Sequence, residues 1–101
     1  MIVVIFEFEP EPTKKGRYFE LAETLSDEVQ KIQGFVSVER FESVHDRNHF
    51  VSISTWENMG AVQQWKEHLR HATAQEEAKG SNIFKHYRIR VAEVVRDYGT
   101  G

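Results

Sequence analysis

A short stretch of the chain, "WKEHLRHATAQ", carries the side chains with the most potential for chemistry. Its functional groups are an indole, two imidazoles and a carboxamide, at Trp65, His68, His71 and Gln75. On a helix that turns about 100° per residue, Trp65 lies on the apolar stripe and the other three form a polar flank on one side of it. We expect a cleft between helix and sheet to open at such a flank.

Four interpretations of this flank are open. In the first, Trp65 is a core residue and the histidines are solvated or hydrogen-bonded at the helix edge. In the second, His68 and His71 chelate a metal, with His86 as a third ligand, although the chain has no HExxH pattern. In the third, a histidine is a general base, because imidazole titrates near neutral pH. In the fourth, a histidine is the axial ligand of haem iron.

Composition limits the class of protein. The chain has 101 residues, a formal net charge of -3 and no cysteine. This length predicts one domain over residues 1–101. The negative charge argues against nucleic acid or anionic lipid as partner, and the lack of cysteine excludes thiol chemistry. The start, "MIVVIFEFEPEP", has neither a basic n-region nor a membrane-length apolar run, so we expect a cytoplasmic protein without a membrane partner.

The elements that must position the flank follow the order βαββαβ. The predicted strands are 2–9, 35–44, 49–57 and 83–95, and the predicted helices are 16–32 and 58–79. Pro10 and Pro12 end the first strand, the polar "HDRN" makes a hairpin of the next two, and Asn58 is a good N-cap for the second helix. This order predicts an α+β, ferredoxin-like sandwich with both helices on one face of a four-stranded antiparallel sheet.

Both faces of the first strand carry apolar side chains. Val3 and Ile5 alternate with larger residues that include Phe6 and Phe8. If the helices cover one face, the other needs a cover, since exposing Phe6 and Phe8 would forfeit about 2 kcal/mol each. We therefore predict a homodimer that packs sheet against sheet. The alternative is a second face that is half-solvated, as in many antiparallel sheets.

The last strand carries a cluster of cationic side chains, Lys85, Arg88 and Arg90. His86 and Arg88 share one face of this strand because side chains alternate along it. The cluster is either an anion site or a solvated edge.

With these features the chain resembles the antibiotic biosynthesis monooxygenase family, whose members are small dimeric α/β-barrel proteins. The resemblance covers nearly the whole chain. It rests on the βαββαβ order and on "GFVSVERFES", "SISTWENMGAVQQWKEHLRHATAQ" and "YRIRVAEVVRDYG", with a W-x-x-H-x-x-H spacing in the second helix.

The resemblance implies oxygenation of an electron-rich aromatic, such as a quinol or polyphenol, by molecular oxygen without flavin, metal or haem. The deprotonated substrate supplies its own electrons, so the protein provides a dry slot, a base and a positive partner for the anion. Trp65 would line the slot, His68 or His71 would be the base, and Arg88 or Lys85 would stabilise the anion. The further substrate contacts would be Phe6, Gln75, Lys85 and His86.

Two other functions remain open. One is a non-enzymatic dimer that binds a small hydrophobic ligand or takes part in a stress response. The other is haem binding or degradation. The resemblance disfavours haem, because haem-degrading members have their ligating histidine ten residues after the helix tryptophan, where this chain has Gln75.

Overall fold

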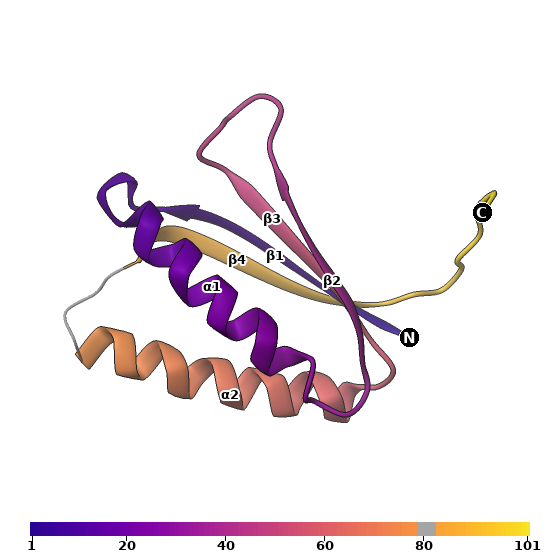
Figure 1. Ribbon diagram of the computed structural model, residues 1–101. Helices are drawn as coiled ribbons and strands as arrows, with labels where there is room; N and C mark the ends of the chain where they lie inside the picture. Colours follow the sequence, from indigo (N-terminus) through magenta and orange to yellow (C-terminus); the bar gives the residue numbers. More distant parts are fainter. Residues whose placement is uncertain (79–82) are drawn as a thin grey trace.

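A four-stranded antiparallel sheet with both helices on one face forms the framework (Figure 1). The computed structural model describes residues 1–78 and 83–101, with the side chains of residues 74–78 excluded. The elements are β1 (Ile2–Pro10), a short 3-10 helix η1 (Pro12–Lys14), α1 (Lys15–Val29), β2 (Phe35–Glu42), β3 (Phe50–Trp56), α2 (Met59–Ala78) and β4 (Phe84–Glu93). The strand order β2-β3-β1-β4 confirms the predicted ferredoxin-like topology.

Most element boundaries differ from the prediction by a few residues, and two of the differences have a local reason. β1 includes Pro10, which pairs with Phe84. The register shifts between Glu9 and Pro10, and at such an irregularity the N–H that proline lacks removes little of the hydrogen-bond ladder. α1 ends at Val29 rather than at residue 32, and the chain continues in tight turns, with the Ile32 N–H donating to the Val29 carbonyl at 3.1 Å. Within the described residues, neither helix is long and apolar enough to cross a bilayer.

Gly34 joins α1 to β2 and lies directly against the start of α2. Its φ is 97°, a conformation that favours glycine, and a Cβ built on it would be 2.8 Å from the Ala61 Cβ. The Gly34 carbonyl accepts a hydrogen bond from the Glu57 N–H at 2.8 Å. Asn58 caps α2 as predicted, since its Oδ1 accepts the Ala61 N–H at 2.9 Å. This junction fixes where α2 begins.

Two apolar clusters lie between the helices and the sheet. The first consists of Ile2, Val29, Trp56, Ala61 and Val62, with Trp65 packed against it. The second consists of Phe8, Tyr18, Phe50 and Ile83, with Phe6 at its edge. Burial raises the pKa of Tyr18, and the hydrogen bond and positive charge of Arg40 oppose that rise.

The structure corrects the prediction about which face of β1 is left uncovered. Phe8 is only 1% exposed, and Phe6 and Phe8 lie on the helix side, so neither needs a second subunit to cover it. The open face instead presents Val3 and Ile5, which are paired in register with Thr55 and Ile53 of β3. Strand alternation separates two faces without telling which of them the helices cover, and the helices cover the face with the larger side chains.

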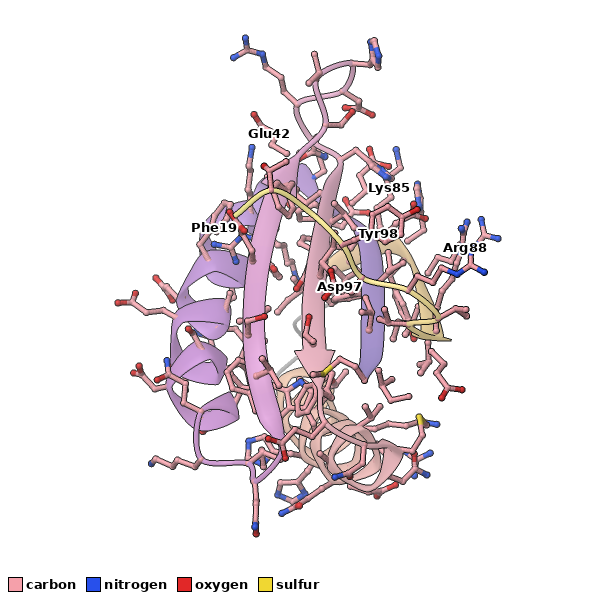
Figure 2. All side chains as sticks on the ribbon, turned by 90° about the vertical axis from the view of Figure 1, so that its right-hand side faces the viewer. Phe19, Glu42, Lys85, Arg88, Asp97 and Tyr98 are labelled. Carbon is pink, nitrogen blue, oxygen red and sulfur yellow. The ribbon has the colours of Figure 1, made fainter. Side chains whose placement is uncertain are left out.

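One part of the helix side remains open. Tyr87, Ile89 and Val91 of β4 are paired with Phe8, Phe6 and Val4, so they point to the same side as the helices. They are nevertheless 62%, 53% and 47% exposed. Figure 1 shows α2 diverging from the sheet along its length and Figure 2 shows α1 on the β2 side, so that neither helix covers this edge strand in the described part of the chain. We call these three residues the β4 strip.

The residues after β4 extend away from the body of the fold (Figure 1). Val95 and Tyr98 on this tail are 88% and 87% exposed.

Candidate functional site

Two helices that are distant in sequence contribute the central contact of the candidate site. Glu28 comes from the last turn of α1 and His68 from the middle of α2, and the His68 Nε2 lies in hydrogen-bonding contact with the Glu28 Oε2. The His68 side chain is 40% exposed and the Glu28 side chain is 37% exposed. The polar flank of α2 therefore faces α1, and a glutamate anchors its first histidine.

Trp65 contacts the face of the His68 imidazole. Its ring stacks on His68 with centroids 5.1 Å apart and planes 14° apart, and it lies 6.3 Å from the Trp56 ring. The buried Trp56 Nε1–H donates to the Ser54 Oγ at 2.9 Å. Among the described residues no acceptor contacts the Trp65 Nε1–H, and no buried side-chain nitrogen lacks a partner, so this N–H reaches the surface. As predicted, Trp65 packs on the core, and it also carries an available donor.

The rest of the predicted flank contributes less. His71 is exposed one turn beyond His68. Gln75 lies within α2, but its side chain is outside the described residues. Among the side chains described, no three His, Cys, Asp or Glu residues gather as metal ligands, so the chelate hypothesis has no third ligand there.

The cationic residues of β4 lie elsewhere. Arg88 is paired in register with Glu7, which places it on the open face, opposite to Trp65 and His68. Figure 2 shows Arg88 and Lys85 projecting from the edge of the sheet. His86 is on the same open face, with its Nε2 2.7 Å from the Glu9 carboxylate. The structure therefore does not bring these three residues together with the helix flank of the same chain.

Phe6 is on the correct side of the sheet but in the other cluster. Its ring packs on Phe8 at 4.9 Å and edge-on to Tyr87 at 5.8 Å. It thus borders the β4 strip and has no ring contact with Trp65 among the described pairs.

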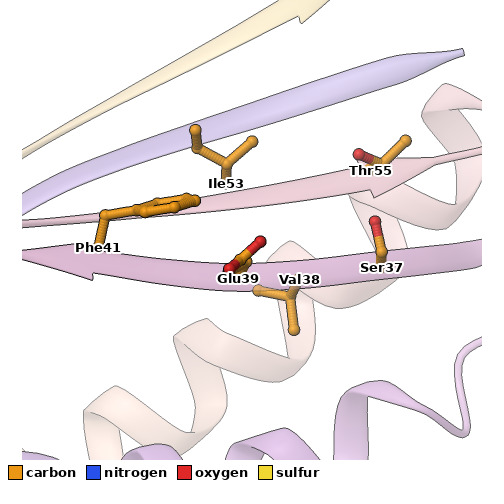
Figure 3. A pocket seen from close by; sticks show the side chains of 6 residues that line it. All are labelled: Ser37, Val38, Glu39, Phe41, Ile53 and Thr55. Atoms are coloured by element: carbon orange, nitrogen blue, oxygen red, sulfur yellow. The ribbon is translucent and has the colours of Figure 1, made fainter. Parts of the chain in front are cut away.

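A shallow depression of about 210 Å³ lies on the open face, over β2 and β3 (Figure 3). It is lined by Ser37, Val38, Glu39, Phe41, Ile53 and Thr55. It is remote from the His68 contact because the sheet separates the two. A titratable side chain and an aromatic wall meet on the helix side of the sheet, and not in this depression.

Sequence reasoning missed two features of this site. The contact of Glu28 with His68 is the first, because an acidic residue near the end of an amphipathic helix is normally solvated and nothing in the sequence marks this one as different. The exposure of the β4 strip is the second, because the divergence of α2 that leaves these residues open cannot be inferred from strand alternation.

Solved structures share this fold over nearly its whole length. Rv0793 from Mycobacterium tuberculosis superposes with a TM-score of 0.80 at 16% identity, covering 97% of this chain and 98% of that one. A variant of SnoaB, a cofactor-independent oxygenase from Streptomyces nogalater, superposes with a TM-score of 0.74 at 14% identity, covering 95% and 94%. At these identities the likeness defines the fold class alone.

Sequence comparison defines the family. The sequence model for antibiotic biosynthesis monooxygenases matches residues 1–77. A jasmonate monooxygenase of Pyricularia oryzae is 30% identical over 94 residues, which are 93% of this chain and 43% of that protein. The chain spans less than half the length of that relative. The chain belongs to the antibiotic biosynthesis monooxygenase family.

Proposed function

We propose that the protein is a cofactor-independent monooxygenase that oxidises an electron-rich aromatic substrate, a quinol or polyphenol, with molecular oxygen. The observation that carries this proposal is the stack of Trp65 on a half-buried His68 that Glu28 anchors, on the side of the sheet where the β4 strip is open. An aromatic wall, a base and an exposed apolar surface are the parts that such a reaction requires.

The reaction needs little more from the protein. His68 takes a proton from a substrate hydroxyl, and the resulting anion donates electrons to oxygen. One oxygen atom then bonds to a ring carbon, and the other leaves as water with two hydrogens of the substrate. We assign the base to His68 rather than to His71, because the described contacts hold the His68 ring in one orientation.

The partner of the substrate anion differs from the expectation. Because Arg88 lies on the opposite face, the Trp65 Nε1–H is the better candidate, as a neutral donor aimed at a developing oxyanion. A donor of this kind contributes through its fixed position rather than through charge.

Haem fits these residues poorly. The helix position where haem-degrading members have their ligand is Gln75 in this chain, and the His68 Nε2 already contacts Glu28. The proposed reaction therefore uses no haem.

A second candidate function is hydroxylation of jasmonate or a similar aliphatic acid, which the name of the Pyricularia oryzae relative favours. The two candidates differ in their electron balance. A quinol provides the electrons that reduce oxygen, whereas inserting oxygen into an aliphatic C–H bond needs two further electrons from an added donor.

We further propose that the open face packs against a second copy of the chain. Its apolar residues include Ile5 and Ile53, the latter 37% exposed. Among the described residues neither Glu39 of β2 nor Arg88 of β4 has a counter-ion, and a two-fold axis along the strands would bring these outer strands of opposite charge together. This arrangement supports the predicted homodimer through apolar side chains other than the phenylalanines.

Oxygen consumption tests the proposed function. The purified protein is incubated with a panel of hydroquinones and polyphenols, and separately with jasmonate and an electron donor, while dissolved oxygen and product mass are followed. We expect turnover of one aromatic class, reduced by a factor of about 10² to 10⁴ in His68→Gln, the usual contribution of a general base. A ligand that raises Tm without any oxygen uptake would instead support the binding-protein alternative.

A further inference from the structure

The Glu28 carboxylate determines which nitrogen of His68 carries the proton. An ionised carboxylate only accepts hydrogen bonds, so the contact between the Glu28 Oε2 and the His68 Nε2 requires Nε2 to donate. When the ring is neutral it then has a single N–H, at Nε2, and its lone pair is on Nδ1.

Two contacts oppose a flip of the His68 ring. Stacking on Trp65, with planes 14° apart, fixes the plane of the imidazole, and the α1 carboxylate fixes which edge faces α1. A 180° turn about the Cβ–Cγ bond would keep the ring plane but place Cε1 where Nε2 was, and the hydrogen bond to Glu28 would be lost. The two contacts come from different helices, so together they define one orientation.

The remaining nitrogen is accessible. Within the part of the chain that the structure describes, Nδ1 has no hydrogen-bond partner, and no buried side-chain nitrogen or oxygen lacks one. Nδ1 must therefore reach the surface, which agrees with a side chain that is 40% exposed. An accessible, unprotonated nitrogen is the atom from which a general base acts.

We propose that Glu28 is a positioning residue that holds His68 as the Nε2–H tautomer, so that Nδ1 is the atom that accepts the substrate's proton. This inference rests on the proposed function for its catalytic part. In the step, the O–H bond of the substrate breaks, an N–H bond forms at Nδ1, and the electron pair stays on the substrate oxygen. The positive charge that develops on the ring lies beside the Glu28 carboxylate, which stabilises it.

Nuclear magnetic resonance of ¹⁵N-histidine-labelled protein reads the tautomer directly, without any substrate. The His68 signal is assigned by its loss in His68→Gln, and spectra are recorded at a pH where the ring is neutral. We expect the Nε2–H pattern in the wild type and a mixture of tautomers in Glu28→Gln. The matched control is Glu23→Gln on the exposed side of α1, which should leave the His68 signal unchanged.

Kinetics test the catalytic part separately. We expect Glu28→Gln to lower kcat on the order of 10- to 100-fold with little change in KM, as for other residues that orient a functional histidine. In a His68→Gln background the same change should have no further effect, because the two residues act as a unit.

The outcomes separate the two proposals. A wild-type ring protonated at Nδ1, or a tautomer unaffected by Glu28→Gln, would overturn the role of Glu28 even if the protein is an oxygenase. The expected spectra together with oxygenation that His68→Gln does not slow would retain the contact with Glu28 but overturn Nδ1 as the base, and with it the catalytic part of the proposed function.

Discussion

Replacing Gly34 by alanine tests the junction that fixes the start of α2. At a φ of 97° an alanine is strained by about 1–2 kcal/mol. Its Cβ would lie 2.8 Å from the Ala61 Cβ, well inside the usual contact of about 3.5–4.0 Å, and such overpacking costs about 1–3 kcal/mol. The reduced freedom of the unfolded chain returns about 0.4–1 kcal/mol. We expect a net loss of about 3 kcal/mol in the free energy of unfolding.

The assay is urea and thermal unfolding followed by circular dichroism. In a domain of this size each kcal/mol shifts Tm by roughly 4–8 °C, so the loss is easily measured. The matched control is Gly16→Ala in α1, where a Cβ meets nothing within 4 Å, and which should stabilise the protein by about 0.5–1 kcal/mol.

A double-mutant cycle separates strain from contact. In an Ala61→Gly background the contact is removed, so Gly34→Ala should cost only the strain, and the two sites should couple by about 2 kcal/mol. A Gly34→Ala protein as stable as Gly16→Ala, or two substitutions whose effects simply add, would refute the close approach of Gly34 to α2.

Three further predictions address the core, the site and the interface. Burial raises the pKa of Tyr18 above 10.0, so the stability contributed by its neutral phenol is complete below about pH 10 and is lost as pH rises through the pKa of the folded state. Tyr18→Phe should flatten this alkaline decline in the free energy of unfolding, and an unchanged decline would contradict the assignment. Trp65→Ala should lower the free energy of unfolding by about 2 kcal/mol, less than the roughly 3–5 kcal/mol expected for a fully buried tryptophan. The variant should fold but no longer bind aromatic ligands in calorimetry, and unchanged ligand affinity would contradict the site. Ile53→Asp should convert a dimer to a monomer in analytical ultracentrifugation, whereas Val44→Asp in the exposed hairpin should leave the dimer intact. A dimer that survives Ile53→Asp would exclude the open face as the interface.

Local signals in the sequence predict the framework well. Alternating apolar residues and the turn between β2 and β3 indicate the strands, and Asn58 indicates the start of α2, because each of these acts through neighbouring residues. Helical spacing also places Trp65 on the core and His68 beside it, as the structure confirms.

Features that depend on how distant elements dock are beyond such signals. Glu28 and His68 are 40 residues apart, and their contact exists only once the end of α1 docks against the middle of α2. Arg88 looked suitable for an anion site by its charge, but its register with Glu7 places it on the opposite face of the sheet. Strand pairing sets that face, and the sequence of a single strand does not encode its partner's register.

The pairing of the two tryptophans gives the protein a built-in optical reporter. Trp56 and Trp65 are the only tryptophans of the chain and lie 6.3 Å apart, close enough to exchange excitation energy, while Trp65 is stacked on an imidazole whose protonated form quenches indole emission. Emission from this pair should respond both to loosening of the core around Trp56 and to proton uptake by His68. Substituting each tryptophan in turn by phenylalanine would separate the two signals and allow both events to be followed without a label.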